Sequence, residues 1–384
     1  MALFEPDAAW TQAADRIQVF KLYGEWVGDD PWTIHASDKD LRQVISDLNQ
    51  RGIALAMEAG PLEATSGCGQ GIEGFGGGAR IGIRDAKRIK AAGGTLSYIA
   101  LDEPFVFASL YNGPNAFQWP AERVAEKIDA YILGVRTVFP DLMIGDTKPL
   151  WGVIDVESYK NWLSTFRRVN GYDLAFFHLD VDFGRGDWAQ AALELETFAR
   201  ELGIDFGIIY DVNPNVSSDE AWLTAAGEWA IMYELVANGQ PDHVLFQSWH
   251  DHPNRTLPEI EPYTFTWFIN AYFDDKARLV VRTKGLGANV AYGKQVTASH
   301  SSQAQPGGDV DGDPNTYLGA GDFAPQWIRI DLGNIYLIGG LRLLTSQSPT
   351  GETSHQVLVQ GPEVEDAFSK VHTFHGVIAD QQWL

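Results

Sequence analysis

Short apolar runs alternate with amphipathic segments of helical period between residues 17 and 249. Such alternation is typical of a parallel sheet covered by helices, because each helix returns the chain to the same edge of the sheet. The segment at 37–52 shows the helical signals clearly, with Ser37 as its N-cap and Gly52 as its C-cap. The pattern predicts an α/β fold. The runs with the length of a strand lie at 17–23, 53–58, 97–102, 142–146, 173–180, 205–211 and 243–249.

The connections differ at the two ends of these strands. Loops after the strands are long and polar, whereas loops before them are short, as in a (β/α)8 TIM-like barrel whose active face lies at the carboxyl ends of its strands. Seven strands are predicted, whereas such a barrel has eight. Either residues 278–283 form the eighth strand, or the first strand of the barrel is missing from this sequence. We favour the second interpretation because residues 3–16 read as a first crossover helix. Residues 97–102 then form strand four and residues 205–211 form strand seven.

Charge and composition restrict the partners. The net charge is −23, which disfavours binding to nucleic acid. The 13 Trp and 13 Tyr residues suit stacking on sugar rings, although aromatic side chains also fill barrel cores. No run is long enough to span a membrane. Cys68 is the only cysteine, so disulfides within the chain are excluded.

The composition changes near residue 286, where helical periodicity stops and alternating, strand-like segments begin. This part resembles the discoidin-like family, the factor 5/8 type C domains and the related sugar-binding modules, and we expect it to be cut short at its C-terminal end. The resemblance implies a β-sandwich over 286–384 that binds carbohydrate, after a barrel over 1–285. The matching segments are 289–291, 296–299, 311–316 and 326–333.

One loop of the second domain is a candidate calcium site. The resemblance implies that Asp313 and Thr316 bind a structural calcium ion, for which hard oxygen ligands are suited. The same Asp-, Gly- and Pro-rich sequence is equally compatible with a tight turn.

Acidic residues gather where the predicted strands end, and in a barrel such positions converge. Like charges in one place are costly to ionise, so a fold gains nothing structurally by collecting them. Glycoside cleavage needs such a set, with one protonated acid for the leaving oxygen and one carboxylate as nucleophile or base. The acids at strand ends are Glu58, Asp102, Glu103, Asp146, Asp180, Asp182 and Asp211.

The segment Leu101-Asp102-Glu103-Pro104 resembles the Asn-Glu-Pro motif of a large superfamily of barrel glycosidases. The resemblance implies that Glu103 is the general acid/base and that the nucleophile ends strand seven. Asp211 holds that place, although the superfamily has Glu there, so a retaining outcome is not implied. The alternative is an ordinary helix start, because acids near a helix N-terminus complement its dipole.

Other polar and aromatic residues near the strand ends are predicted to bind substrate. Lys21 is equally compatible with an ordinary barrel salt bridge. His178, Asp180 and Asp182 also permit a metal-dependent hydrolase or lyase. The predicted substrate-binding residues are Lys21, Tyr23, Glu58, Asp102, His178, Asp180, Asp182, Tyr210, Gln247, Trp249 and His250.

The sequence therefore predicts a monomeric glycoside hydrolase that acts on a polysaccharide or oligosaccharide and needs no cofactor for catalysis. We expect it to be secreted or on the cell surface, with a leader that this sequence does not include. The alternative from another class is a non-catalytic polysaccharide-binding or adhesion protein, since discoidin-like modules serve adhesion too.

Overall fold

The structure is a computed structural model in two compact units, Met1–Val280 and Val281–Leu384, and each is described by itself. The predicted domain boundary after residue 285 lies outside the described residues. The structure describes residues 1–384 except 30–34, 153, 213–215, 275–288, 300–309, 312–315, 317–318, 320–324, 334–335, 337, 339, 346, 348, 361–367 and 381.

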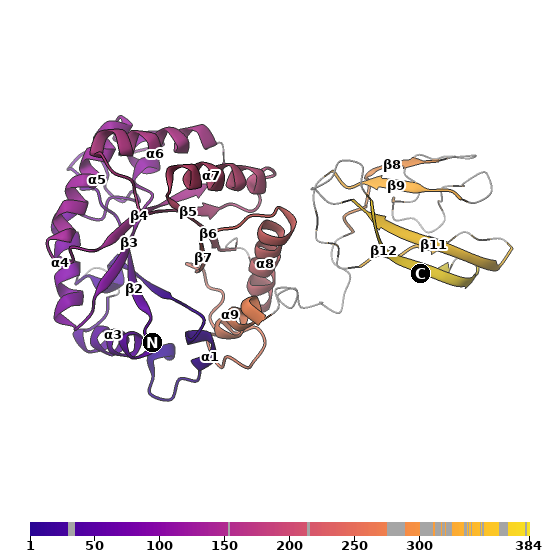
Figure 1. The fold of residues 1–384 in the computed structure, drawn as a ribbon, viewed down its shortest axis with the longest axis horizontal. Coiled ribbons are helices and arrows are strands. Elements are labelled where there is room, and N and C mark those ends of the chain that lie inside the picture. The colour runs from indigo at the N-terminus through magenta and orange to yellow at the C-terminus, as the bar shows by residue number, and fades with distance from the viewer. Residues whose placement is uncertain are drawn as a thin grey trace. The chain divides into compact units, whose positions relative to one another are not determined.

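The first unit contains a seven-stranded parallel sheet whose strands pair in chain order. Figure 1 shows this sheet curled inside a layer of helices. The predicted α/β class and all seven predicted strand segments are confirmed. Among the described residues, β7 pairs only with β6 and β1 only with β2. The strands are β1 (Val19–Tyr23), β2 (Ala54–Ala59), β3 (Leu96–Asp102), β4 (Met143–Leu150), β5 (Phe176–Val181), β6 (Asp205–Tyr210) and β7 (His243–Phe246).

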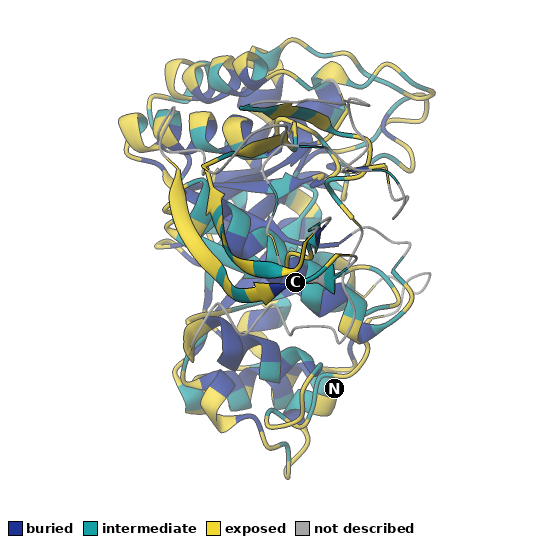
Figure 2. Ribbon diagram, turned by 90° about the vertical axis from the view of Figure 1, so that its right-hand side faces the viewer, coloured by how far each residue is buried: buried dark blue, intermediate teal, exposed yellow. Residues whose placement is uncertain are grey.

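Helices follow the strands and bury one face each, as the dark blue inner faces in Figure 2 show. The Ser37 hydroxyl accepts a hydrogen bond from the Asp40 N–H, and Gly52 ends the same helix in the left-handed conformation, so both predicted caps are confirmed. The helices are α1 (Thr11–Ala14), α2 (Gly24–Val27), α3 (Asp38–Arg51), α4 (Gly78–Ala91), α5 (Ala121–Arg136), α6 (Val156–Asn170), α7 (Trp188–Leu202), α8 (Asp219–Ile231) and α9 (Phe265–Asp274), with a 3-10 turn at Ala2–Phe4 and π-helices η2 (Val106–Leu110) and η3 (Met232–Val236).

The N-terminal segment differs from the prediction. Residues 3–16 do not form one crossover helix, because only a 3-10 turn and the four-residue α1 are helical there. Helix α1 contacts α9. The N–H groups of Gln12 and Ala13 donate to the carboxylate of Glu259 at 3.2 and 2.9 Å. These contacts join the two ends of the helix layer. The predicted eighth-strand alternative at 278–283 lies in the part of the chain that is not described.

Side chains inside the curled sheet are packed by alternating large and small residues. A Cβ on Gly145 would lie 2.2 Å from the Phe176 ring, and one on Gly207 would lie 2.5 Å from the His178 ring. Both glycines therefore leave room for side chains of β5. The interior is a packed core below the carboxyl ends of the strands, where functional side chains are expected.

The second unit is all-β in its described residues, as predicted, but the discoidin-like sandwich stays a prediction. Its described residues form three antiparallel pairs. Strand β9 lies in the segment 326–333 that carries the resemblance, and its four residues are all exposed. The pairs are β8 (Gln295–Ala298) with β9 (Ile328–Asp331), β10 (Leu344–Thr345) with β13 (Gln382–Trp383), and β11 (Gly351–Val359) with β12 (Ser369–Ile378).

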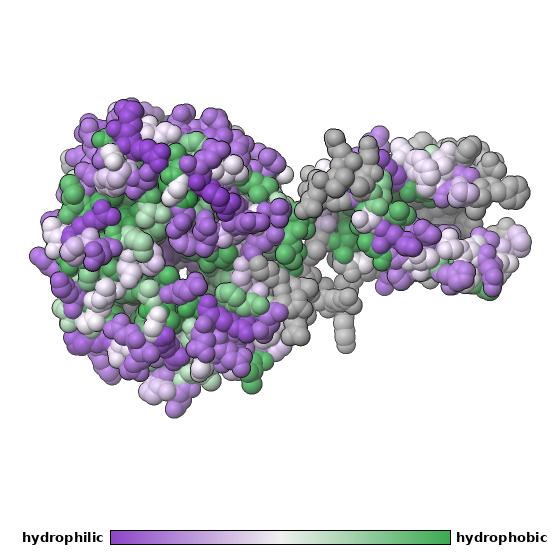
Figure 3. Space-filling model, viewed as in Figure 1, coloured by the Kyte–Doolittle hydropathy of each residue, from purple (hydrophilic) through white to green (hydrophobic). Residues whose placement is uncertain are grey.

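The outer surface of the first unit is largely hydrophilic in the view of Figure 3. Within the described ranges, no helix has both the length and the apolar character needed to cross a membrane.

Candidate active site

Carboxyl groups converge at the carboxyl ends of the parallel strands. We call this group the carboxylate cluster. Each member influences the charge of another member or of Tyr23, or is itself influenced by a member, which requires that they lie close together. Tyr23, at the end of β1, is influenced by four of them and therefore lies among them. The carboxylate cluster consists of Glu58, Glu73, Asp102, Glu103, Asp180 and Asp211.

The register of the strands explains the convergence. Tyr23 is level with Glu58, because β1 and β2 pair in that register. Asp102 is level with Thr147, and Thr147 is level with His178. Side chains two residues apart on a strand share a face, so Asp180 continues the inward face of His178. The sequence prediction that strand-end acids meet is therefore met for these positions.

Glu103 is the most perturbed carboxyl of the cluster. Its side chain is 6% exposed, and burial, followed by the charges of Asp180 and Asp102, raises its pKa to about 10. Its backbone is left-handed at φ 47°, which is rare for a residue with a side chain. The π-helix η2 begins three residues later. At neutral pH Glu103 is therefore a protonated acid held in a strained backbone position, as functional residues often are.

Asp102 and Asp180 are the two members of the cluster whose pKa values are raised to near neutrality. Burial, then Glu58 and Glu73, raises the pKa of Asp102 to about 7. Burial, then Asp211 and Glu58, raises the pKa of Asp180 to about 7. Both groups therefore titrate near neutrality.

Asp211 has the lowest pKa of the four cluster members Asp102, Glu103, Asp180 and Asp211, so it ionises most readily of these. Burial raises its pKa to about 6, while the Val212 N–H and His250 favour the charged form. The His250 Nε2 atom lies 3.6 Å from Asp211 Oδ2. His252 instead contacts Asp219, with 2.6 Å between Nδ1 and Oδ1. The two histidines thus serve different carboxylates.

Lys21 and Tyr23 lie two residues apart on the same face of β1. The Lys21 ammonium pairs with the Glu58 carboxylate. Burial, followed by the charge of Glu58, raises the pKa of Tyr23, so the phenol stays protonated and able to donate. The salt bridge that the sequence allowed for Lys21 is therefore present, whereas its role in substrate binding stays a prediction.

A glycine-rich loop between β2 and α4 brings in Glu73, which the sequence analysis did not identify. Burial and then Glu58 raise the pKa of Glu73. A Cβ on Gly60 would lie 2.5 Å from the Gly76 nitrogen, and one on Gly74 would lie 3.1 Å from the Asp102 oxygen. The glycines thus permit backbone-to-backbone contacts that hold Glu73 beside the end of β3.

Gly74→Ala should lower the free energy of unfolding by about 1–3 kcal/mol, because Gly74 has φ +79° and its Cβ would meet strand backbone. Gly71→Ala is the matched control, since Gly71 has φ +68° but nothing within 4 Å of its Cβ. Chemical denaturation measures both. An equal loss in the two variants would contradict the packing argument.

His178 lies below the cluster rather than in it. It stacks on Phe176, and its Nε2 atom lies 3.0 Å from His243 Nδ1. Burial and His243 lower its pKa well below the usual range, so the ring is neutral. The prediction that His178 binds substrate stays untested, and the ring is buried.

Two predicted positions are corrected by the geometry. Tyr210 is fully buried, and its hydroxyl donates to Glu234 Oε1 at 2.9 Å, so it presents no ring face to a sugar. Asp146 does not end its strand, because β4 continues to Leu150. It is fully buried, accepts from Trp162 Nε1 at 2.7 Å and pairs with Lys148 at 2.6 Å. Both side chains face the helix layer.

Asp182 and the segment after β7 lie at more open positions. Asp182 is exposed beyond the end of β5 and accepts from the Gly184 N–H at 2.9 Å. Trp249 is 48% exposed, as a stacking platform must be. The Gln247 Oε1 atom is buried and has no partner among the described residues. Trp151, directly after β4, is 45% exposed and was not predicted.

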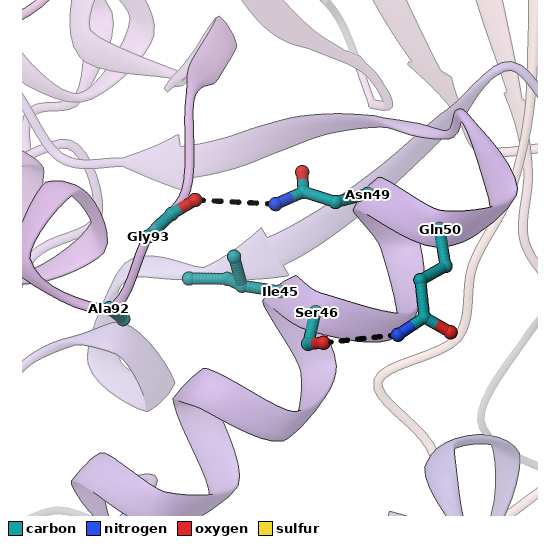
Figure 4. A pocket seen from close by; sticks show the side chains of 6 residues that line it. All are labelled: Ile45, Ser46, Asn49, Gln50, Ala92 and Gly93. Carbon is teal, nitrogen blue, oxygen red and sulfur yellow. Dashed lines mark hydrogen bonds between the residues drawn. The ribbon is translucent and has the colours of Figure 1, made fainter.

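Two shallow hollows lie away from the cluster. Figure 4 shows one between α3 and the turn after α4, where Asn49 donates to the Gly93 oxygen at 3.2 Å. These segments precede strands, so the hollow lies at the opposite end of the sheet. The other lies between α6 and α7 beside Lys160, which pairs with Glu157 and Glu194.

The sequence predicted two possible metal sites, one at the strand ends of the first unit and one in a loop of the second unit. In the described ranges, no three His, Cys, Asp or Glu side chains are grouped to hold one ion. Asp313 lies outside the described residues. The Thr316 hydroxyl donates to the Asp311 carboxylate at 2.8 Å, so oxygen atoms of a type suited to calcium meet in this loop.

The raised carboxyl pKa values also predict a pH dependence of stability. The unfolded chain ionises Asp102 near pH 4, whereas the folded protein keeps it protonated to about pH 7. The folded state then binds more protons, so stability falls as pH rises between these values. The wild type should therefore lose about 2 kcal/mol of its free energy of unfolding between pH 5 and pH 7, and Asp102→Asn should not show this loss. Chemical denaturation at the two pH values measures the difference. Glu126→Gln on α5 is the charge control, and absence of the loss there too would contradict the argument.

The fold and the cluster define a class: an α/β protein with a TIM-like curled parallel sheet and ionisable groups at its strand ends. No protein-family model matches the sequence, and no curated protein matches it. Similar solved structures include the GH53 catalytic domain of Ignisphaera aggregans (9% identity, TM-score 0.41, covering 60% of this chain and 74% of that chain). A mannohexaose complex of β-mannanase from Thermomonospora fusca (13%, 0.40, 62% and 73%) and an HpcH/HpaI aldolase from Desulfitobacterium hafniense (10%, 0.34, 64% and 82%) are also similar. Likeness at this level carries no argument about substrate or reaction.

Proposed function

We propose that the first unit hydrolyses glycosidic bonds in a polysaccharide. The observation that carries the proposal is the difference in pKa between two carboxyls at the same end of the sheet. The pKa of Glu103 is about 10, and that of Asp211 is about 6. A protonated acid and an ionised carboxylate in one site are the pair that this chemistry needs.

In this mechanism Glu103 donates its proton to the leaving glycosidic oxygen. Asp211 acts as the nucleophile or as the base for water, and His250 supports its charged form from 3.6 Å. Asp180 is influenced by Asp211 and in turn influences Glu103, so it links the two charges. Trp249 is exposed, and its ring centroid lies 6.2 Å from that of His250, so it offers a stacking face next to the histidine that faces Asp211.

The second unit is proposed to bind carbohydrate and raise the local concentration of the polymer. Its discoidin-like identity, the calcium ion in the loop of Asp313 and Thr316, and the secreted location of the protein are proposals that rest on sequence alone.

A reducing-end assay tests the proposed activity. The full chain is incubated with galactan, mannan, cellulose, chitosan and chitin, and the double variant Glu103→Gln, Asp211→Asn is the blank. New reducing ends from at least one polymer, absent with the blank, would support the proposal. No release from any polymer, or equal release by the blank, would overturn it.

A further inference from the structure

A buried ion pair lies behind the turn that carries Glu103. The Lys148 ammonium pairs with the Asp146 carboxylate at 2.6 Å, and both side chains are fully buried. Lys148 also influences the charge of Glu103, so the pair lies near the acid. Taking two charges out of water is costly, and well-packed apolar residues of similar volume are often at least as stabilising. Stability alone therefore does not explain why the pair is there.

The ion pair holds the ring of Trp162 on α6. The Trp162 Nε1 atom donates to the second oxygen of the Asp146 carboxylate at 2.7 Å, and Lys148 Nζ lies 5.6 Å from the ring centroid. The same ring stacks on Phe105, with 4.8 Å between the ring centroids and 14° between the ring planes. The hydrogen bond at its edge and the stacking on its face together fix the orientation of Trp162.

The backbone at Glu103 needs support from its surroundings. A left-handed residue with a side chain, here at φ 47°, persists only where neighbouring groups hold it. The glycine-rich loop provides one contact, because a Cβ on Gly74 would lie 3.0 Å from Pro104 Cα. The stack of Phe105 on Trp162 provides another, two residues after the acid. The turn is thus held both by this loop and by the helix layer.

We propose that the Asp146–Lys148 pair positions Glu103 for proton transfer, because it holds the Trp162 ring against Phe105 and so fixes the turn. Asp146, Lys148 and Trp162 are fully buried and act through Phe105, so they are positioning residues. This inference rests on the proposed function, in which Glu103 is the acid. It gives a role to a buried charge pair that lies outside the carboxylate cluster.

Two double variants separate support of the ring from the charge of Lys148. The first, Asp146→Asn with Lys148→Met, removes both charges but keeps an oxygen that accepts from the Trp162 N–H. The second, Asp146→Leu with Lys148→Met, removes the same charges and that acceptor. We expect the second to lower kcat on the polymer by about 10–100-fold at unchanged KM, because a displaced acid transfers its proton poorly. The first should stay within about threefold of wild type.

An aryl glycoside with an acidic phenol and the variant Tyr233→Phe are the controls. The aryl substrate needs little protonation of its leaving group, so the second double variant should lose less than about threefold on it. A purely structural role of the pair would lower the rates on both substrates alike. Tyr233→Phe removes another hydrogen bond to a buried carboxylate, that of Glu196 at 2.6 Å, and should leave both rates unchanged.

NMR follows the turn itself and needs no activity. In the full chain with isotope-labelled glutamate, the Glu103 amide signal is identified by its absence from the spectrum of Glu103→Gln. We expect this signal to shift in the second double variant and to keep its wild-type position in the first. If the second variant does not fold, adding Trp162→Phe removes the last polar atom of the three side chains, and the same shift is expected.

The outcomes separate this inference from the proposed function. Equal kcat values of the two double variants on the polymer would overturn the inference, because the acceptor for Trp162 would then be without effect. An unchanged Glu103 signal in the second variant, or equal losses on the polymer and the aryl glycoside, would also overturn it. If the wild type releases no reducing ends from any polymer, the proposed function fails, and the NMR signals still decide whether the pair positions Glu103.

Discussion

Glu103→Gln is expected to lower kcat by about 10²–10⁴-fold on the polysaccharide that the protein hydrolyses. Glutamine keeps the shape of the protonated acid but has no proton to transfer to the leaving oxygen. Because Glu103 is protonated at neutral pH, the substitution changes no charge there. Initial rates of reducing-end release measure the loss, and circular dichroism checks that the fold is retained.

The leaving group provides a sharper control for this prediction. An aryl glycoside of the same sugar with an acidic phenol needs little protonation, so Glu103→Gln should affect it much less than the polymer. Equal losses on the two substrates would show that Glu103 has another role, such as positioning. Full activity on the polymer would remove Glu103 from the mechanism.

Asp211→Asn is expected to lower kcat by at least about 10³-fold. The amide neither attacks the anomeric carbon nor activates water, and His250 loses the charge that it faces at 3.6 Å. The pH profile of the wild type should rise through about pH 6 as Asp211 ionises. Rates across pH for wild type and variant measure both effects.

Added azide or formate distinguishes the two roles open to Asp211. If Asp211 is the nucleophile, a small anion can occupy the space of the lost carboxylate, and the variant should form a glycosyl adduct of that anion. If Asp211 activates water, the product should have inverted configuration at the anomeric carbon. A variant with wild-type rates would show that Asp180 or another member of the cluster carries the reaction.

The strands and most helices could be predicted because their signals are local. Apolar runs gave the seven strands, and Ser37 and Gly52 marked the ends of a helix before any contact was known. The convergence of Glu58, Asp102 and Asp211 also followed, since parallel strands end at one edge of the sheet.

The sequence prediction was wrong for Asp146 and Tyr210. Neighbouring residues of a strand face opposite sides of the sheet, so an error of one residue in the position of a side chain reverses its direction. Strand β4 runs on to Leu150, so Asp146 lies in its middle and faces the helices. Tyr210 is the last residue of β6, and alternation directs it outward to Glu234. Glu73 could not be found from sequence because its place depends on the contacts of Gly60 and Gly74 across the loop.

The left-handed backbone at Glu103 has a consequence for engineering. Glycine at this position would relieve the unfavourable φ of 47° and remove a buried acid at the same time. A library screened for heat resistance alone is therefore expected to enrich sequences that have lost the acid at position 103. Stabilised variants of this protein should be selected with catalytic turnover as a second criterion in every round.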